Sequence, residues 1–170
     1  RKEVIDLIVM GTRGATDDME IAYGRNSVNV MENIRECAVL AIPRNVSYKG
    51  INEIVFPTNF KSQFKAKEID IFVKIAKKEN TPIRILHIGK EVDLSEKQKN
   101  NRKQLENYFS ELEYSYYWIE KVGVKEGVLS FVDLRKSGMI GFVNRKHWFF
   151  GSVFSNPLVK RCSMYFLFMR

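Results

Sequence analysis

The feature that most constrains this 170-residue chain is a run of apolar residues from Val4 to Met10 that stops at glycines. Gly11 and Gly14 follow the run, and Gly24 comes after nine intervening residues, just ahead of a helical pattern. A nearly continuous apolar run is typical of a strand covered on both faces in a parallel sheet. Strand, glycine loop and helix in this order predict a turn whose backbone N–H groups hold an anion, most often a nucleotide phosphate.

The residues up to Pro43 predict only three elements. After the glycine loop, Ser27 can cap a helix that runs to about Glu36. Residues 37–42 then form a second short buried strand. A polar stretch with one glycine predicts a linker at 45–52.

A complete alternation of strands and helices begins at Glu53. Apolar runs predict strands at 53–57, 82–88, 114–122, 139–143 and 164–169. Helical spacing predicts four helices between these strands. The first is capped near Ser62 and has a core face of Ile69, Phe72, Val73 and Ala76. The second spans 93–111 with a capping box at Ser95–Gln98, and the others span 125–136 and 151–161. Right-handed crossovers turn this order into an α/β fold, a doubly wound parallel five-stranded sheet of the Rossmann-like type.

The opening segment repeats the last third of the chain. Sliding Gly24 onto Gly151 also places residues 37–42 against 164–169, which gives a repeat of about 127 residues. We therefore expect residues 1–44 to be the C-terminal part of a first domain, a partial second copy of the fold, and residues 53–170 to be a complete domain. We also expect the given sequence to begin inside a domain, because a buried-type strand follows Arg1 almost at once.

Composition narrows the partners that the chain can have. The net charge is +8, but the lysines are scattered over helix faces with glutamates between them, which favours solvated surface over a nucleic-acid site. Cys37 and Cys162 show no metal-binding spacing. The apolar runs are too short to cross a membrane and no signal sequence opens the chain, so a cytoplasmic location is the default.

The glycine spacing resembles the nucleotide motif of the universal stress protein family. That motif is Gly-x2-Gly-x9-Gly followed by Ser or Thr, and its nucleotide is ATP. The resemblance implies a nucleotide site at Gly11, Gly14 and Gly24, with Arg25 at the hydroxyl position and Ser27 two residues on. Mg²⁺ accompanying ATP would offset the charge of the carboxylates at 17, 18 and 20.

The complete second unit carries a degenerate version of the same site. Pro57 and Asn59 resemble the family's Pro-x-Asp turn, with Asn in place of Asp. Gly151 and Ser152 are kept, but Asn144 begins a shortened loop with bulky residues where the family has Gly-x-x-Gly. In the family the opening strand supplies the adenine and ribose contacts, and the first unit of this sequence lacks that strand. The resemblance therefore implies ATP binding by the intact first domain, half a site in this chain, and poor binding by the second domain.

The function implied is binding and regulation in a stress response, without a catalytic group and with weak ATP hydrolysis left open. His87 and His147 have no neighbours that define a catalytic set, and His87 is expected to be a bonded residue at the core edge. Two alternatives remain: a nucleotide-dependent enzyme of a related α/β fold, and RNA binding through the basic and aromatic residues 145–150.

The resemblance also implies how the fold assembles. In the family the closing strands of two domains pair, so residues 38–42 and 164–169 are expected to form either a homodimer contact or an intramolecular pseudo-dimer.

Overall fold

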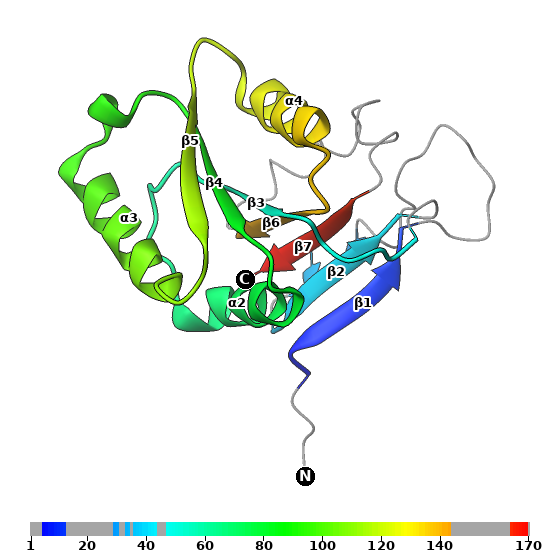
Figure 1. The fold of residues 1–170 in the computed structure, drawn as a ribbon. Coiled ribbons are helices and arrows are strands. Elements are labelled where there is room, and N and C mark those ends of the chain that lie inside the picture. The colour runs from blue at the N-terminus through cyan, green and yellow to red at the C-terminus, as the bar shows by residue number, and fades with distance from the viewer. Residues whose placement is uncertain are drawn as a thin grey trace.

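The computed structural model describes residues 5–12, 29–30, 33–34, 36–43, 47–143 and 164–169. Its strands form one seven-stranded sheet in the order β1-β2-β7-β6-β3-β4-β5 (Figure 1). The elements are β1 (Leu7–Gly11), β2 (Ala38–Ile42), β3 (Ile54–Pro57), α2 (Ala66–Glu79), β4 (Ile83–Ile88), the 3₁₀ helix η1 (Glu91–Asp93), α3 (Glu96–Tyr108), β5 (Tyr114–Ile119), α4 (Val124–Arg135), β6 (Met139–Val143) and β7 (Tyr165–Met169).

The five strands from β3 onward confirm the predicted parallel sheet. β3 pairs in parallel with β4 and β6, β4 with β5, and β6 with β7. The chain therefore moves outward from β3 to β5 and then returns through α4 to the other side of β3, which is the doubly wound order. The predicted helices at 27–36 and 151–161 lie largely or wholly outside the described residues.

The two strands that precede residue 44 extend this sheet. β2 pairs antiparallel with β7, so that Val39 lies opposite Phe168 and Ala41 opposite Phe166. β1 then pairs in parallel with β2 along its whole length. The predicted pairing of residues 38–42 with 164–169 is thus confirmed within the chain.

Of the two predicted helix caps, the one at Ser95 is confirmed and the one near Ser62 is wrong. Ser95 accepts the N–H of Gln98, and the Ser95 N–H donates to Gln98 Oε1 at 3.0 Å, so the predicted capping box is present. The cap near Ser62 is wrong, because α2 starts at Ala66 with Lys65 as its N-cap residue. Phe64, just ahead of this cap, is buried in the core, and its N–H donates to Gln104 of α3. The hydrogen bond of the Phe64 backbone to α3 and the contact of its ring with Phe56 hold this residue ahead of the helix, which therefore starts later than predicted.

Alternation along the strands divides the core into two clusters. Ile54 and Phe56 of β3 point to the cluster covered by α2 and α3, where Ile69, Phe72 and Ala76 of the predicted helix face are fully buried. Val55 lies between them in sequence and points to the opposite cluster, which α4 covers. The sheet is therefore the middle layer of three.

Gly141 in β6 shows how tightly this arrangement is packed. A Cβ atom added at Gly141 would lie 2.5 Å from Cε2 of Phe72, whose ring is fully buried. No such contact exists at Gly11, where no heavy atom of the described residues lies within 4 Å of a Cβ. The two glycines therefore have different structural roles although both lie in strands.

We predict that Gly141→Ala destabilises the fold, because the methyl group would overlap a buried ring that cannot move freely. The free energy of unfolding in urea should fall by about 1–3 kcal/mol. Gly11→Ala is the matched control and should leave that free energy unchanged within about 0.5 kcal/mol. Introducing Phe72→Leu first should shrink the cost of Gly141→Ala, and equal costs in both backgrounds would contradict the proposed contact.

Candidate functional site

The five parallel strands β3 to β7 are called the five-stranded part of the sheet. A crevice is expected in this part at the point where the strand order reverses. The chain leaves β3 for β4 on one side and returns to β6 on the other, so the reversal lies between β3 and β6. In open α/β sheets, ligands bind at the carboxyl ends of the strands at this point. Those ends are Pro57 of β3 and Val143 of β6.

The turn after β3 is closed by its own side chains. The N–H of Phe60 donates to Thr58 Oγ1 at 3.1 Å, and the N–H of Lys61 donates to Asn59 Oδ1 at 3.0 Å. Phe60 has a φ of 55°, a left-handed conformation that is uncommon for a bulky residue. The Asn59 side-chain oxygen, at the position the family resemblance assigns to a nucleotide contact, is therefore engaged in the local turn.

The beginning of α3 holds this turn from the other side. Gln98 Nε2 donates to the Asn59 carbonyl at 2.8 Å, and Asn101 Nδ2 donates to the Phe60 carbonyl at 2.7 Å. Asn101 is buried, so its amide is committed to this contact. Sequence reasoning missed both roles, although an asparagine on the apolar side of a polar helix was a usable signal.

Phe60 fills the space beside the turn with an aromatic cluster. Its ring is fully buried and stacks on His87 with centroids 5.4 Å apart, and Trp118 lies 6.2 Å away. His87 Nδ1 lies 2.9 Å from the Thr58 carbonyl, which can only accept, so this nitrogen carries the proton. The prediction that His87 is a bonded residue at the core edge is confirmed.

Gly11 lies at the opposite strand ends of the sheet from Pro57 and Val143. Because β2 and β7 are antiparallel, the carboxyl ends of β1 and β2 point away from those of β3 and β6. The structure therefore does not bring Gly11 together with Pro57 and Asn59. Gly14, Gly24, Arg25, Ser27, Asn144, Gly151 and Ser152 lie outside the described residues.

Gly11 is the last residue of β1, and Thr12 follows it. The Thr12 N–H donates to the Ile42 carbonyl at 3.1 Å, and Thr12 is only 2% exposed. Gly11 itself is exposed, its φ lies outside the left-handed region, and an added Cβ atom would have no heavy atom of the described residues within 4 Å. Neither backbone conformation nor described packing demands glycine here.

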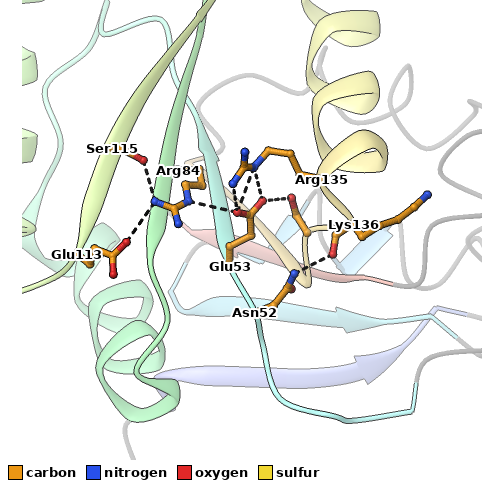
Figure 2. Close-up of polar contacts among 8 residues, drawn as sticks. Asn52, Glu53, Arg84, Glu113, Ser115, Arg135 and Lys136 are labelled. Carbon is orange, nitrogen blue, oxygen red and sulfur yellow. Dashed lines mark hydrogen bonds and ion pairs between the residues drawn. The ribbon is translucent and has the colours of Figure 1, made fainter.

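A second polar cluster lies at the amino end of β3, where Glu53 joins three elements (Figure 2). Arg135 Nη2 of α4 lies 2.7 Å from Glu53 Oε2, and Arg84 Nε of β4 lies 3.2 Å from the same oxygen. Ser137 Oγ donates to Glu53 Oε1 at 2.6 Å. Arg84 also donates to Ser115 Oγ of β5 at 2.9 Å, so the cluster ties β3, β4, β5 and the end of α4 together.

The charge of Glu53 is held by its partners. Burial alone would raise the pKa of this carboxyl group, but hydrogen bonds from Arg135, Ser137 and Arg84 outweigh it and hold the pKa below its ordinary value of 4.5. The cluster lies at the end of the strands opposite to the crevice, which indicates a structural role. A glutamate directly ahead of one buried strand and an arginine within the next were the available sequence signals.

The architecture is shared with proteins of known structure. No known protein-family model matches the sequence, and no curated protein is a detectable relative. A universal stress protein from Archaeoglobus fulgidus DSM 4304 superposes with a TM-score of 0.69 at 17% identity, over 97% of this chain and 62% of that one. The chain has the universal-stress-protein fold.

Two further structures show the same similarity. A putative universal stress protein from Pseudomonas aeruginosa UCBPP-PA14 has a TM-score of 0.61 at 9% identity, covering 96% of this chain and 62% of that one. A second universal stress protein from Archaeoglobus fulgidus has a TM-score of 0.50 at 17% identity, covering 69% of this chain and 93% of that one. This chain therefore spans about 62% of the two longer structures. Among the described helices, none has the length and apolar character that crossing a bilayer requires.

We predict that Glu53→Gln lowers the free energy of unfolding at pH 7 by roughly 3 kcal/mol, because it leaves two guanidinium groups without their anion. Urea denaturation measures this change. Glu113→Gln is the matched control: its side chain is 74% exposed and 3.5 Å from Arg84, so its removal should cost under about 0.5 kcal/mol. Equal costs for the two variants would show that the cluster does not hold the sheet.

The same variant tests the charge state of Glu53. A carboxyl group whose pKa is lowered by folding stabilises the protein above its ordinary pKa, and this stabilisation is lost as the pH falls through the folded-state value. The stability difference between wild type and Glu53→Gln should therefore be constant well above pH 4.5 and shrink as the pH falls through 4.5 toward the folded-state value. A difference that stays constant or grows as the pH falls well below 4.5 would contradict the lowered pKa.

Proposed function

We propose that this chain belongs to a universal-stress-type protein whose intact first domain binds a nucleotide and which acts by regulation in a stress response rather than by turnover. The observation that carries the proposal is Gly11 at the carboxyl end of a parallel strand, in a position where neither described packing nor backbone conformation requires glycine. A nucleotide phosphate is the ligand that such a strand end and the following Gly-x2-Gly-x9-Gly pattern suit. The shared fold supports the same assignment.

ATP is the proposed nucleotide. Gly11, Gly14 and Gly24 would let the main chain approach the phosphates, and Arg25 and Ser27 would donate to their oxygens. Mg²⁺ would accompany ATP near the acidic residues of the loop. The role of this chain's residues is to bind and orient the phosphates.

The five-stranded part is proposed to bind nucleotide poorly. Asn59 Oδ1 already accepts a hydrogen bond from Lys61, and the Phe60 ring fills the space between Thr58, His87 and Trp118. A base or ribose at this crevice would have to displace a fully buried ring. This part would instead supply stability to the sheet.

The proposed organisation is a tandem one. Residues 1–44 would be the C-terminal part of one domain, 45–52 a linker and 53–170 a second domain, with β2 and β7 forming an intramolecular pseudo-dimer contact. Two observations support this division: the antiparallel β2–β7 junction, and coverage of 93% of a shorter universal stress protein but 62% of a longer one. A cytoplasmic location is part of the same proposal.

Gly11→Val tests the nucleotide site directly. We expect ATP affinity, measured by isothermal titration calorimetry, to fall at least about tenfold, because a side chain would separate the main chain from the phosphate. The free energy of unfolding should stay within about 0.5 kcal/mol of wild type, since valine suits a strand and its Cβ atom would have no heavy atom of the described residues within 4 Å.

Asn59→Ala is the matched control in the other crevice and should leave ATP affinity unchanged. Loss of affinity in Asn59→Ala with none in Gly11→Val would place the site in the five-stranded part. Steady release of phosphate that Gly11→Val abolishes would favour the enzymatic alternative instead. Saturable, salt-sensitive binding of single-stranded RNA would favour the nucleic-acid alternative.

A further inference from the structure

Helices α2 and α3 lie on the same face of the sheet, where both cover one core cluster (Figure 1). Their outward sides are rich in lysine. Together the two helices carry eight basic and five acidic residues, whereas α4 on the opposite face carries two of each. The positive charge of the described helices is therefore concentrated in one layer.

The lysines of α2 form a row on its outer side. Helical spacing places Lys67, Lys74 and Lys78 opposite the buried residues Phe72 and Ala76. The row is about 16 Å long, because each helical residue rises about 1.5 Å. With the exposed lysines of α3, these residues define the α2–α3 surface, which consists of Lys67, Lys74, Lys78, Lys97, Lys99 and Lys103.

All five carboxylates of α2 and α3 already have a partner. Asp70 lies 2.6 Å from Nζ of Lys74, and Glu96 lies 2.7 Å from Nζ of Lys99. The other three meet a guanidinium group, a main-chain N–H and a tyrosine hydroxyl, in the pairs Glu106 with Arg102, Glu68 with Lys65, and Glu79 with Tyr48. No acidic residue of either helix is therefore left to balance further lysines.

Four lysines of the α2–α3 surface keep an unbalanced charge. Within the part of the chain that the structure describes, no carboxylate oxygen lies within 4 Å of the ammonium groups of Lys67, Lys78, Lys97 and Lys103. The spacing of lysines and glutamates in the sequence does not show which of them are paired. The pairing in the structure leaves a surplus that is wholly positive.

Two of these lysines lie where the helix itself disfavours a positive charge. Lys67 and Lys97 are the second residues of α2 and α3. The amino end of a helix carries a partial positive charge, so a lysine in the first turn lowers the stability of the helix. Helix stability does not explain these two lysines, whereas contact with an anionic partner does.

The surface lacks the features that proteins and membranes require of a partner. The large apolar side chains that are exposed among the described residues all lie outside α2 and α3. Protein interfaces have an apolar or aromatic centre, and membrane-bound helices insert an apolar face. Single-stranded nucleic acids stack their bases on aromatic rings, and neither helix has an exposed one. Charge alone suits the phosphate backbone of a duplex.

We propose that the α2–α3 surface binds the phosphate backbone of a nucleic-acid duplex without reading its base sequence. Packed helices lie about 8–10 Å apart, and the major groove of duplex DNA is about 12 Å wide. Lysines on the two helices can therefore meet phosphates on both sides of one groove. This binding goes beyond the nucleotide site proposed at Gly11, and none of the six lysines belongs to that site.

Fluorescence anisotropy of a labelled DNA duplex of about 20 base pairs tests the proposal with the full chain. Between about 50 and 200 mM salt, the logarithm of the association constant should fall against that of the salt concentration with a slope of about −3 to −4, because about four phosphates are neutralised. Replacing Lys67, Lys78 and Lys103 together by Gln should weaken binding at least about tenfold and bring the slope to about −1.

A matched triple variant controls for net charge. Replacing Lys121, Lys125 and Lys136 by Gln removes the same charge around α4 and should weaken binding less than about threefold. Equal losses in the two triple variants, or no saturable binding of the duplex at about 50 mM salt, overturn the proposal. Binding of poly-glutamate but not of the duplex would also overturn it, and would identify an acidic protein as the partner.

Two further variants separate duplex binding from folding and from the nucleotide site. Lys97→Glu places an acidic residue in the first turn of α3, so the free energy of unfolding should not fall although duplex affinity does. Unchanged duplex affinity in Lys97→Glu would remove α3 from the surface and overturn the contact with both sides of a groove. Gly11→Val should leave duplex affinity unchanged, so failure of the nucleotide proposal is distinguishable from failure of this one.

Discussion

The antiparallel pairing of β2 with β7 is the contact on which the arrangement of this protein depends. A two-stranded ribbon is marginal by itself in water, so the β1–β2 pair needs a larger sheet beside it. β7 supplies that sheet because it pairs in parallel with β6 and is the last of five parallel strands. The pairing also reverses the strand direction at the junction. As a result, the carboxyl end of β1 and the carboxyl end of β3 lie at opposite strand ends of the sheet.

Most of the fold could be predicted because buried parallel strands leave a direct trace in the sequence. The runs at 54–57, 139–143 and 165–169 contain no charged residue, and the run at 83–88 is interrupted only by Arg84 and His87. Each of the four runs lies within one residue of its predicted bounds. The face of α2 followed from the spacing of Ile69, Phe72 and Ala76, since helical periodicity records which side is buried. The closing-strand pairing, in contrast, came from family resemblance and not from periodicity.

What could not be predicted depends on contacts between residues far apart in the sequence. Glu53 meets Arg135 and Ser137 across 82 and 84 positions, and no local pattern marks such partners. The start of α2 was misplaced because Phe64 is held by Gln104, 40 positions away. The position of the Phe60 ring could not be predicted either. It depends on stacking with His87 and on the hydrogen bond from Asn101 to the Phe60 carbonyl, and both partners are distant in sequence.

The division of roles between the two ends of the sheet follows from these contacts. The five-stranded part is closed at both strand ends, by the Phe60 turn at one and the Glu53 cluster at the other. Its aromatic edge strand is covered by two guanidinium groups. The β1–β2 pair has none of these devices among its described residues: Gly11 is exposed, β1 contains no charged residue, and the side chains of Ile5 and Val9 are largely uncovered by the described residues. Sites that bind a ligand or a partner need unfilled space and unpaired main-chain groups, both of which cost stability. The five parallel strands can supply that stability to the β1–β2 pair through the β2–β7 pairing.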